Sequence, residues 1–172
     1  HLNMRYERVL PGDLLDIAHQ QQLKGVKIHV EDGESQSLQK LNDRQLHDFK
    51  EKAKKYNLDV HIETSASDKA TLTDAIRIAV ATGATSVRFY PRYEGHLNDV
   101  MAKIANDIAW LSQYDDCGLS FTIEQHEDLQ GHELVTLVNN SGMKNLSILF
   151  YFGNMINANE QPLSALEVMS PL

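Results

Sequence analysis

The sequence predicts an α/β protein whose parallel strands form a (β/α) barrel-like sheet. Helix and strand patterns alternate along the chain, and the pair recurs every ~30 residues, which is the length of a βαβ unit. Four of the five strand patterns alternate strictly between apolar and polar residues. Strands of an open parallel sheet are buried on both faces and are nearly all apolar. Strict alternation therefore favours a closed barrel, in which one face of each strand meets the helices and the other lines the lumen.

The first part of the chain contains two helix–strand units. A helical pattern over Asp13–Leu23 precedes a strand at Val26–Glu31. A second helix begins at Asn42, a good N-cap residue, and ends at Asn57, which tolerates the left-handed conformation. The strand Leu58–Glu63 follows directly.

Two further units follow. Thr71–Asp74 resembles a capping box at the start of a helix that stops at Gly83. After the strand Ser86–Tyr90, the longest apolar stripe predicts a helix from Leu97 to near Gly118. It leads into the strand Leu119–His126, whose alternation places Glu124 at its end, where ligands bind in α/β folds.

The last part of the chain adds one more strand between two helices. Glu133–Val138 predicts a short helix that stops at Gly142, and Leu146–Phe152 predicts a strand. The segment Gly153–Gln161 is expected to be a loop before a final helix at Pro162–Met169.

Length and composition indicate one globular domain, residues 1–172. A complete eight-unit barrel needs roughly 250 residues, so about six units are expected here. The chain opens without methionine and stops after a helical pattern, so we expect an incomplete barrel, with a shorter open sheet as the alternative.

Charge and cysteine content narrow the partners and the compartment. A net charge of −8 argues against binding to nucleic acid, which requires clustered Lys and Arg. No apolar run is long enough for a membrane span, so no membrane partner is expected. Cys117 is the only cysteine, which excludes an intrachain disulfide and favours a reducing, cytoplasmic location.

Ionisable side chains of one parity converge at the carboxyl ends of the predicted strands. Carboxylate and imidazole are ligands of Mg, Mn or Zn, and a glutamate can also move a proton at a carbon beside a carbonyl. Arg88 would suit a phosphate or carboxylate group of a substrate. The alternative is a set of structural ion pairs and packed lumen residues. The set comprises His29, Glu31, His61, Glu63, Arg88, Tyr90, Glu124, His126 and Tyr151.

Three local motifs occur in order along the chain: Gly25–Ile28, Ile123–His126, and Phe150–Asn154 followed by Pro162–Leu166. Together they resemble motifs of the sugar phosphate isomerase/epimerase family. They are similar to that family's second strand, to the Glu-Asn-His end of its fifth strand, and to its sixth strand with the helix after it. These proteins are xylose isomerase-like TIM barrels, and the group includes an AP endonuclease branch.

The resemblance implies a divalent-metal isomerase or epimerase (Mn, Mg or Zn) acting on a sugar, keto-sugar or sugar phosphate. It implies that Glu124 is both metal ligand and catalytic acid/base. We expect His126 and Asn154 to contact the substrate, with Glu63 and Arg88 as auxiliary binding residues.

One departure keeps a second function open. Tyr151 stands where the resemblance implies an aspartate ligand, and the seventh- and eighth-strand ligands have no counterpart in this sequence. Phenol is a poor ligand for a hard divalent ion. The alternative is a catalytically impaired protein that binds a small polar ligand, with Tyr151 among the contacts. An exposed barrel edge could also pair with another copy of the chain, as a homo-oligomer.

Overall fold

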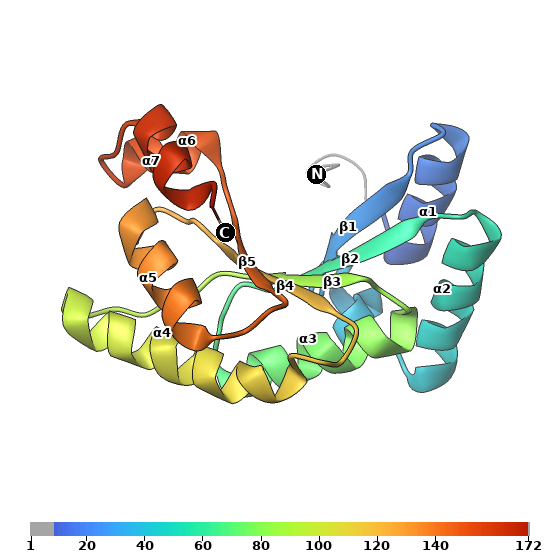
Figure 1. Cartoon of the computed structure of the whole chain (residues 1–172). Helices are drawn as coiled ribbons and strands as arrows, with labels where there is room; N and C mark the ends of the chain where they lie inside the picture. Colours follow the sequence, from blue (N-terminus) through green and yellow to red (C-terminus); the bar gives the residue numbers. More distant parts are fainter. Residues whose placement is uncertain (1–8, 172) are drawn as a thin grey trace. The chain divides into compact units, whose positions relative to one another are not determined.

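The computed structural model describes residues 9–171, in which five strands alternate with helices (Figure 1). The strands are hydrogen-bonded in chain order, from β1 to β5. β1 pairs with β2 in parallel, and β4 pairs with β5 in parallel. This arrangement confirms the predicted α/β class with a parallel sheet. The strands are β1 (Gly25–His29), β2 (Asp59–Glu63), β3 (Ser86–Phe89), β4 (Ser120–Glu124) and β5 (Leu146–Leu149).

The chain divides into two compact units. The first holds the residues up to Thr64 together with Thr73–Val87, and the second holds Ser65–Leu72 together with the residues from Arg88 onward. The boundary runs through β3, so Arg88 and Phe89 belong to the second unit.

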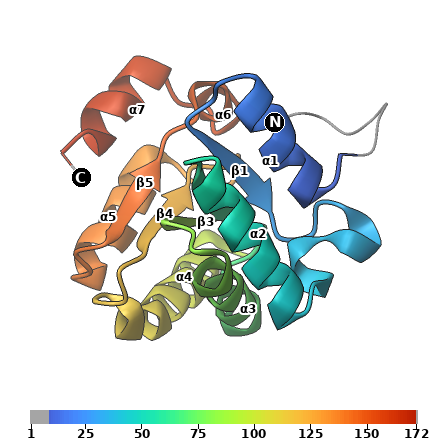
Figure 2. The ribbon, with the colours of Figure 1, turned by 90° about the vertical axis from the view of Figure 1, so that its right-hand side faces the viewer.

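In the first unit, two helices accompany the β1–β2 pair. α1 (Pro11–Gln20) packs against β1 and against α2 (Asp43–Lys55), as Figure 2 shows. Two short 3-10 turns, Glu34–Gln36 and Leu38–Lys40, link β1 to α2. Most of α3 (Lys69–Thr82) also belongs here. The alternation of the two strands buries their apolar residues, and the register sets Lys27 opposite His61 and His29 opposite Glu63.

In the second unit, four helices accompany β4 and β5. α5 contacts α4, α7 and β5, and α6 contacts α7. Met155, Ala165 and Met169 form a buried cluster with Val135, Ile148 and Phe150 packed against it. The helices are α4 (Leu97–Leu111), α5 (Gly131–Ser141), α6 (Phe152–Asn157) and α7 (Pro162–Met169), with a 3-10 turn at Ser112–Tyr114.

The predicted start of α3 is wrong. The helix begins at Lys69 and not at the expected capping box near Thr71. The Asp68 carboxylate accepts hydrogen bonds from the backbone N–H groups of Ala70 (3.0 Å) and Thr71 (3.1 Å). An N-cap aspartate satisfies these two donors. Asp68 therefore acts as the N-cap, and the helix begins earlier in the chain than the predicted capping box at Thr71–Asp74. Its bonds with Thr71 lower the pKa of Asp68, although burial opposes them.

The expected loop Gly153–Gln161 contains a helix, and the predicted strand before it is too long. β5 ends at Leu149, Tyr151 is the N-cap of α6, and the helix starts at Phe152. α6 places Met155 in the buried cluster with α7, so a contact distant in sequence stabilises a helix too short to be seen as a periodic pattern. The predicted helix end near Gly118 is also late, because α4 stops at Leu111.

Other boundaries agree with the sequence. Asn42 caps α2 by accepting from the backbone N–H of Gln45 at 3.0 Å, and Asn57 has a φ of 52°. Within the described range, none of the helices has the length and apolar character needed to cross a bilayer.

Candidate functional site

A buried ion pair lies at the end of β4 in the second unit. Nε of Arg88 on β3 lies 2.9 Å from Oε2 of Glu124, the last residue of β4. Arg88 is 7% exposed and Glu124 6% exposed. The apolar residues that alternate with this pair along the two strands are fully buried, namely Val87, Phe89, Phe121 and Ile123. The structure brings Arg88 and Glu124 together, as the strand pattern predicts.

Two aromatic rings flank this pair. Tyr90 follows β3 and His126 follows β4, and their rings stack with centroids 4.4 Å apart and planes 6° from parallel. The Arg88 guanidinium lies 5.3 Å from the centroid of the Tyr90 ring, and that of Arg92 lies 5.5 Å from it. Tyr90 and His126 are half-buried, so the stack faces both the ion pair and solvent. Arg88, Tyr90, Glu124 and His126 therefore form one cluster, which we call the β3–β4 cluster.

The end of β4 is fixed by an amide network. The buried Gln125 donates from Nε2 to the Leu129 carbonyl at 2.9 Å, and Asn154 on α6 donates from Nδ2 to the Gln125 carbonyl at 2.9 Å. Asn154, expected to contact substrate, thus ties α6 to the backbone beside Glu124. This contact gives Asn154 a positioning role in the described structure.

The loop after β3 is anchored by a carboxylate that sequence reasoning missed. Asp107 on α4 accepts from the Tyr93 hydroxyl at 2.6 Å and from the Ser67 hydroxyl at 2.6 Å through the same oxygen. Burial and the bond to Asp107 raise the pKa of Tyr93 to about 12. Tyr93 could have been suspected only from its place in a strand-to-helix loop. No periodic signal marks Asp107 or Ser67.

Glu63 and His61 belong to the first unit. The fully buried Glu63 pairs with Lys27, with Oε1 and Nζ 2.7 Å apart. His61 and Ser86 are joined by a hydrogen bond of 2.7 Å between Nδ1 and Oγ. The alternative interpretation from sequence, structural ion pairs, thus describes Lys27 and Glu63. Tyr151 lies in the second unit as the half-buried N-cap of α6.

The described residues do not fit the divalent metal that the resemblance implies. The Glu124 carboxylate faces the Arg88 guanidinium, and Tyr151 offers a phenol where a carboxylate is implied. Within residues 9–171, no three His, Cys, Asp or Glu side chains are placed to hold one ion. Glu124 as a metal ligand remains a prediction that this geometry does not support.

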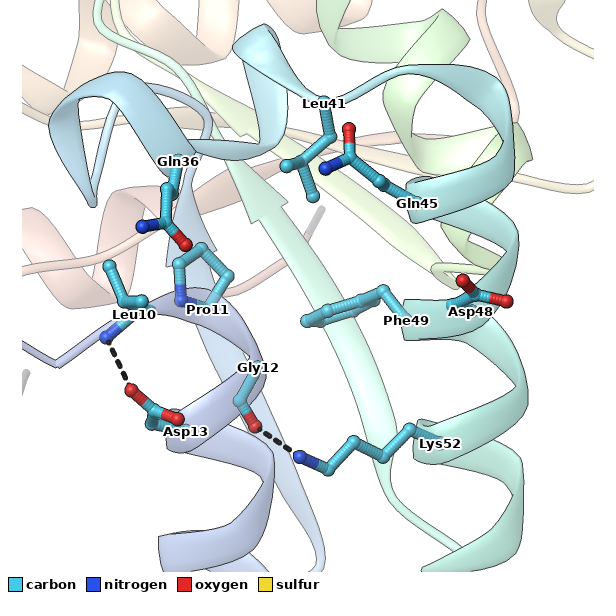
Figure 3. A pocket seen from close by; sticks show the side chains of 10 residues that line it. All are labelled: Leu10, Pro11, Gly12, Asp13, Gln36, Leu41, Gln45, Asp48, Phe49 and Lys52. Atoms are coloured by element: carbon cyan, nitrogen blue, oxygen red, sulfur yellow. Dashed lines mark hydrogen bonds between the residues drawn. The ribbon is translucent and has the colours of Figure 1, made fainter.

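Two pockets lie apart from the predicted site residues. Figure 3 shows one of 320 Å³ in the first unit, between α1 and α2, where Lys52 donates to the Gly12 carbonyl at 2.9 Å. Lys52 also donates to Asp16 at 2.7 Å, so its positive charge is paired with a carboxylate of the protein. The other, of 400 Å³, is lined mainly by the β4–α5 loop and the end of α6 in the second unit, with Glu127, Asp128 and Asn157 among its residues. It adjoins the cluster in sequence, because Glu127 follows His126.

Comparison with solved structures defines the class of fold. The crystal structure of a D-psicose 3-epimerase in the presence of D-fructose matches 94% of this chain and 64% of its own, with a TM-score of 0.78 and 12% identity. A xylose isomerase domain protein from Planctomyces limnophilus matches 91% of this chain and 64% of its own, with a TM-score of 0.72 and 14% identity. The chain therefore has the fold of the xylose isomerase-like TIM barrels, and the resemblance expected from its motifs is confirmed at the level of fold.

Among curated proteins, the uncharacterized protein YihM of Escherichia coli (strain K12) is 63% identical over 172 residues. The match covers 99% of this chain and 53% of YihM. The chain thus spans about half the length of this relative and less than two thirds of the epimerase. No protein-family model matches it.

Proposed function

We propose that the full-length protein is an isomerase or epimerase acting on a sugar or a related keto compound, with Glu124 as the group that moves the proton. The observation that carries the proposal is the position of Glu124, a carboxylate at the carboxyl end of a parallel strand in this fold. Ligands in such barrels bind at that end of the strands. The psicose epimerase neighbour, solved with D-fructose, supports a ketose as the first compound to test.

The chemistry assigned to Glu124 is proton transfer at a carbon next to a carbonyl. The carboxylate takes the proton, and the C–H electron pair moves into the carbonyl group to form an enediolate. Return of the proton to the former carbonyl carbon, with transfer of the hydroxyl proton from the neighbouring oxygen to the former carbonyl oxygen, completes an aldose–ketose isomerisation. Epimerisation at the same carbon requires a second acid on the opposite face of the enediolate.

The rest of the β3–β4 cluster has binding roles in this proposal. The Arg88 guanidinium places positive charge where the enediolate oxygen develops negative charge. The stacked rings of Tyr90 and His126 offer a flat surface, with polar groups at its edge, to a sugar. Asn154 holds the backbone of Gln125 and so orients the residues on either side of it.

The test is hydrogen–deuterium exchange in the full-length protein. Incubation in D₂O with D-fructose and a panel of ketoses should place deuterium at the carbon beside the carbonyl, measured by NMR. Glu124→Gln should lower the exchange rate at least 100-fold, the scale of a lost general base. Glu51→Gln, on the exposed face of α2, is the matched control and should exchange like the wild type. Equal rates in wild type and Glu124→Gln would refute the assignment.

The second function is binding of a small polar ligand without catalysis. Two observations favour it: Arg88 neutralises Glu124, and Tyr151 stands at the implied aspartate position. It predicts a rise in melting temperature with a bound ketose or sugar phosphate and no deuterium incorporation. Deuterium incorporation that depends on Glu124 would decide against it.

A further inference from the structure

We propose that Arg88 is the resident cation of the β3–β4 cluster and that Glu124 is therefore not a metal ligand. In this inference the guanidinium takes the place beside Glu124 where the resemblance implies a divalent ion, and ligands bind without a metal. The inference rests on the proposed function only in placing the ligand at this strand end. The claim about Arg88 and Glu124 can be tested by itself.

The buried Arg88–Glu124 pair is neutral as a whole. Both partners of the pair are more than nine-tenths buried, and a buried carboxylate needs an opposite charge close by. Arginine stays protonated at every physiological pH, so the neutralising charge is permanent. A divalent ion at Glu124 would lie a few ångströms from that guanidinium and be repelled by it.

The Arg88 guanidinium is held on two sides. It contacts Glu124 through Nε and lies over the Tyr90 ring, whose partner in the stack is His126. To vacate the carboxylate, Arg88 would have to give up the ion pair and the cation–π contact together. The cluster therefore opposes replacement of arginine by a metal ion.

The imidazole of the β3–β4 cluster, that of His126, is arranged for stacking. His126 Nδ1 lies 3.8 Å from Asp128 Oδ2, which is longer than a hydrogen bond. Zinc, for example, would need a ring nitrogen about 2.0–2.1 Å from the metal, with a carboxylate at a similar distance. Turning His126 towards Glu124 would break its parallel stack with Tyr90.

The first experiment titrates the full-length protein with Mn²⁺ and follows the free ion by electron paramagnetic resonance. Wild type, Glu124→Gln and the control Glu51→Gln should show the same stoichiometry and dissociation constants within twofold. Loss of one Mn²⁺ site, or more than tenfold weaker binding, in Glu124→Gln alone would overturn the proposal.

A second measurement titrates metal into folded wild-type protein, because Glu124→Gln leaves a buried guanidinium that could prevent folding. The Arg88 Nε–H resonance is observed in a ¹H–¹⁵N spectrum, and Arg88→Lys serves only to assign it by its loss. Substoichiometric Mn²⁺ should leave its intensity unchanged relative to the Nε–H of Arg77, an exposed residue of α3. Selective broadening of the Arg88 signal would place the metal at Glu124 and refute the inference.

A third experiment, deuterium exchange before and after treatment with EDTA, separates this inference from the proposed function. Deuterium exchange that persists after treatment with EDTA supports both proposals. Exchange that EDTA abolishes and Mn²⁺ restores overturns the role of Arg88 but keeps the enzyme. If no sugar exchanges, the proposed function fails, and the Mn²⁺ titration and the Arg88 signal still decide the inference.

Discussion

Two cation–carboxylate pairs, one in each compact unit, show how differently similar charges can be held. In the first unit Lys27 reaches Glu63 at 2.7 Å, with the lysine side chain 36% exposed and the glutamate side chain fully buried. In the second unit Arg88 and Glu124 lie 2.9 Å apart, with side chains 9% and 7% exposed. Only the cation differs in its surroundings, because both carboxylates lie at strand ends and are buried.

The difference shows which pair can change its partner. The Lys27 ammonium lies at the end of a flexible side chain that water reaches. Solvent can therefore take over part of its interaction with Glu63. Arg88 is planar and packed against Tyr90, and it cannot be replaced by water without opening the cluster. Lys27 therefore acts as a structural counter-ion of Glu63. Arg88, by contrast, is a positive charge held in a fixed position beside Glu124.

The largest expected effect comes from removing each cation in turn. Arg88→Met should lower the free energy of unfolding by about 3–5 kcal/mol, because it leaves a buried carboxylate unpaired. Lys27→Met should cost only about 1–2 kcal/mol, because water can enter beside Glu63. Urea unfolding followed by circular dichroism measures both. Equal losses for the two variants would contradict the contrast between the pairs.

A charge-conserving exchange sharpens the same comparison at smaller scale. Arg88→Lys keeps the charge but loses the planar group over Tyr90, so it should cost about 1–2 kcal/mol. Lys27→Arg should stay within about 0.5 kcal/mol of wild type, as expected for a partly exposed position. The same unfolding assay reads both variants. A Lys27→Arg loss as large as that of Arg88→Lys would show that ordinary crowding, and not the stack, sets the cost.

The smallest effect concerns the loop that carries Tyr90 and is anchored by Tyr93. The pKa of Tyr93 rises from 10.0 to about 12, so the folded protein holds this proton more tightly than the unfolded chain. The stabilisation is therefore complete below pH 10 and is lost as the pH rises from 10 to about 12. Tyr93→Phe should lose about 1 kcal/mol at pH 8, typical of one hydrogen bond.

The measurement is the free energy of unfolding from pH 8 to 12, with tyrosinate absorbance followed in parallel. Tyr93→Phe should remove a tyrosine that titrates above pH 10, and the difference in unfolding free energy between this variant and wild type should narrow above pH 10. Tyr114→Phe, which removes a different tyrosine hydroxyl, is the control variant for both measurements. A difference between wild type and Tyr93→Phe that stays constant to pH 12 would show that the Asp107 contact does not hold this proton.

Much of the fold could be predicted from local pattern. The alternation in β1, β2, β3 and β4 defines their buried faces, and Asn42, Asn57 and Gly142 mark helix ends by their own conformational preferences. The α6 helix could not be predicted this way. Its one buried residue, Met155, gains its partners from other segments of the chain, Ala165 and Met169 of α7 among them, so the signal lies in a contact and not in a period.

The site was predictable only in part. The parity of the strands predicted that Arg88, Glu124 and His126 share one end of the sheet, because side chains of one parity point to one face. It did not predict the Tyr90–His126 stack or the Asp107 anchor, which join residues from different segments.

By itself, the sequence determined the class of fold and the residue types gathered at the strand ends, because both follow from short-range periodicity and charge. Only the tertiary structure decided which groups pair. The Glu124 carboxylate is equally suited to a metal, a substrate proton or a guanidinium. The choice of Arg88 depends on the approach of β3 to β4 and on the rings beside them, and no spacing along the chain specifies that approach.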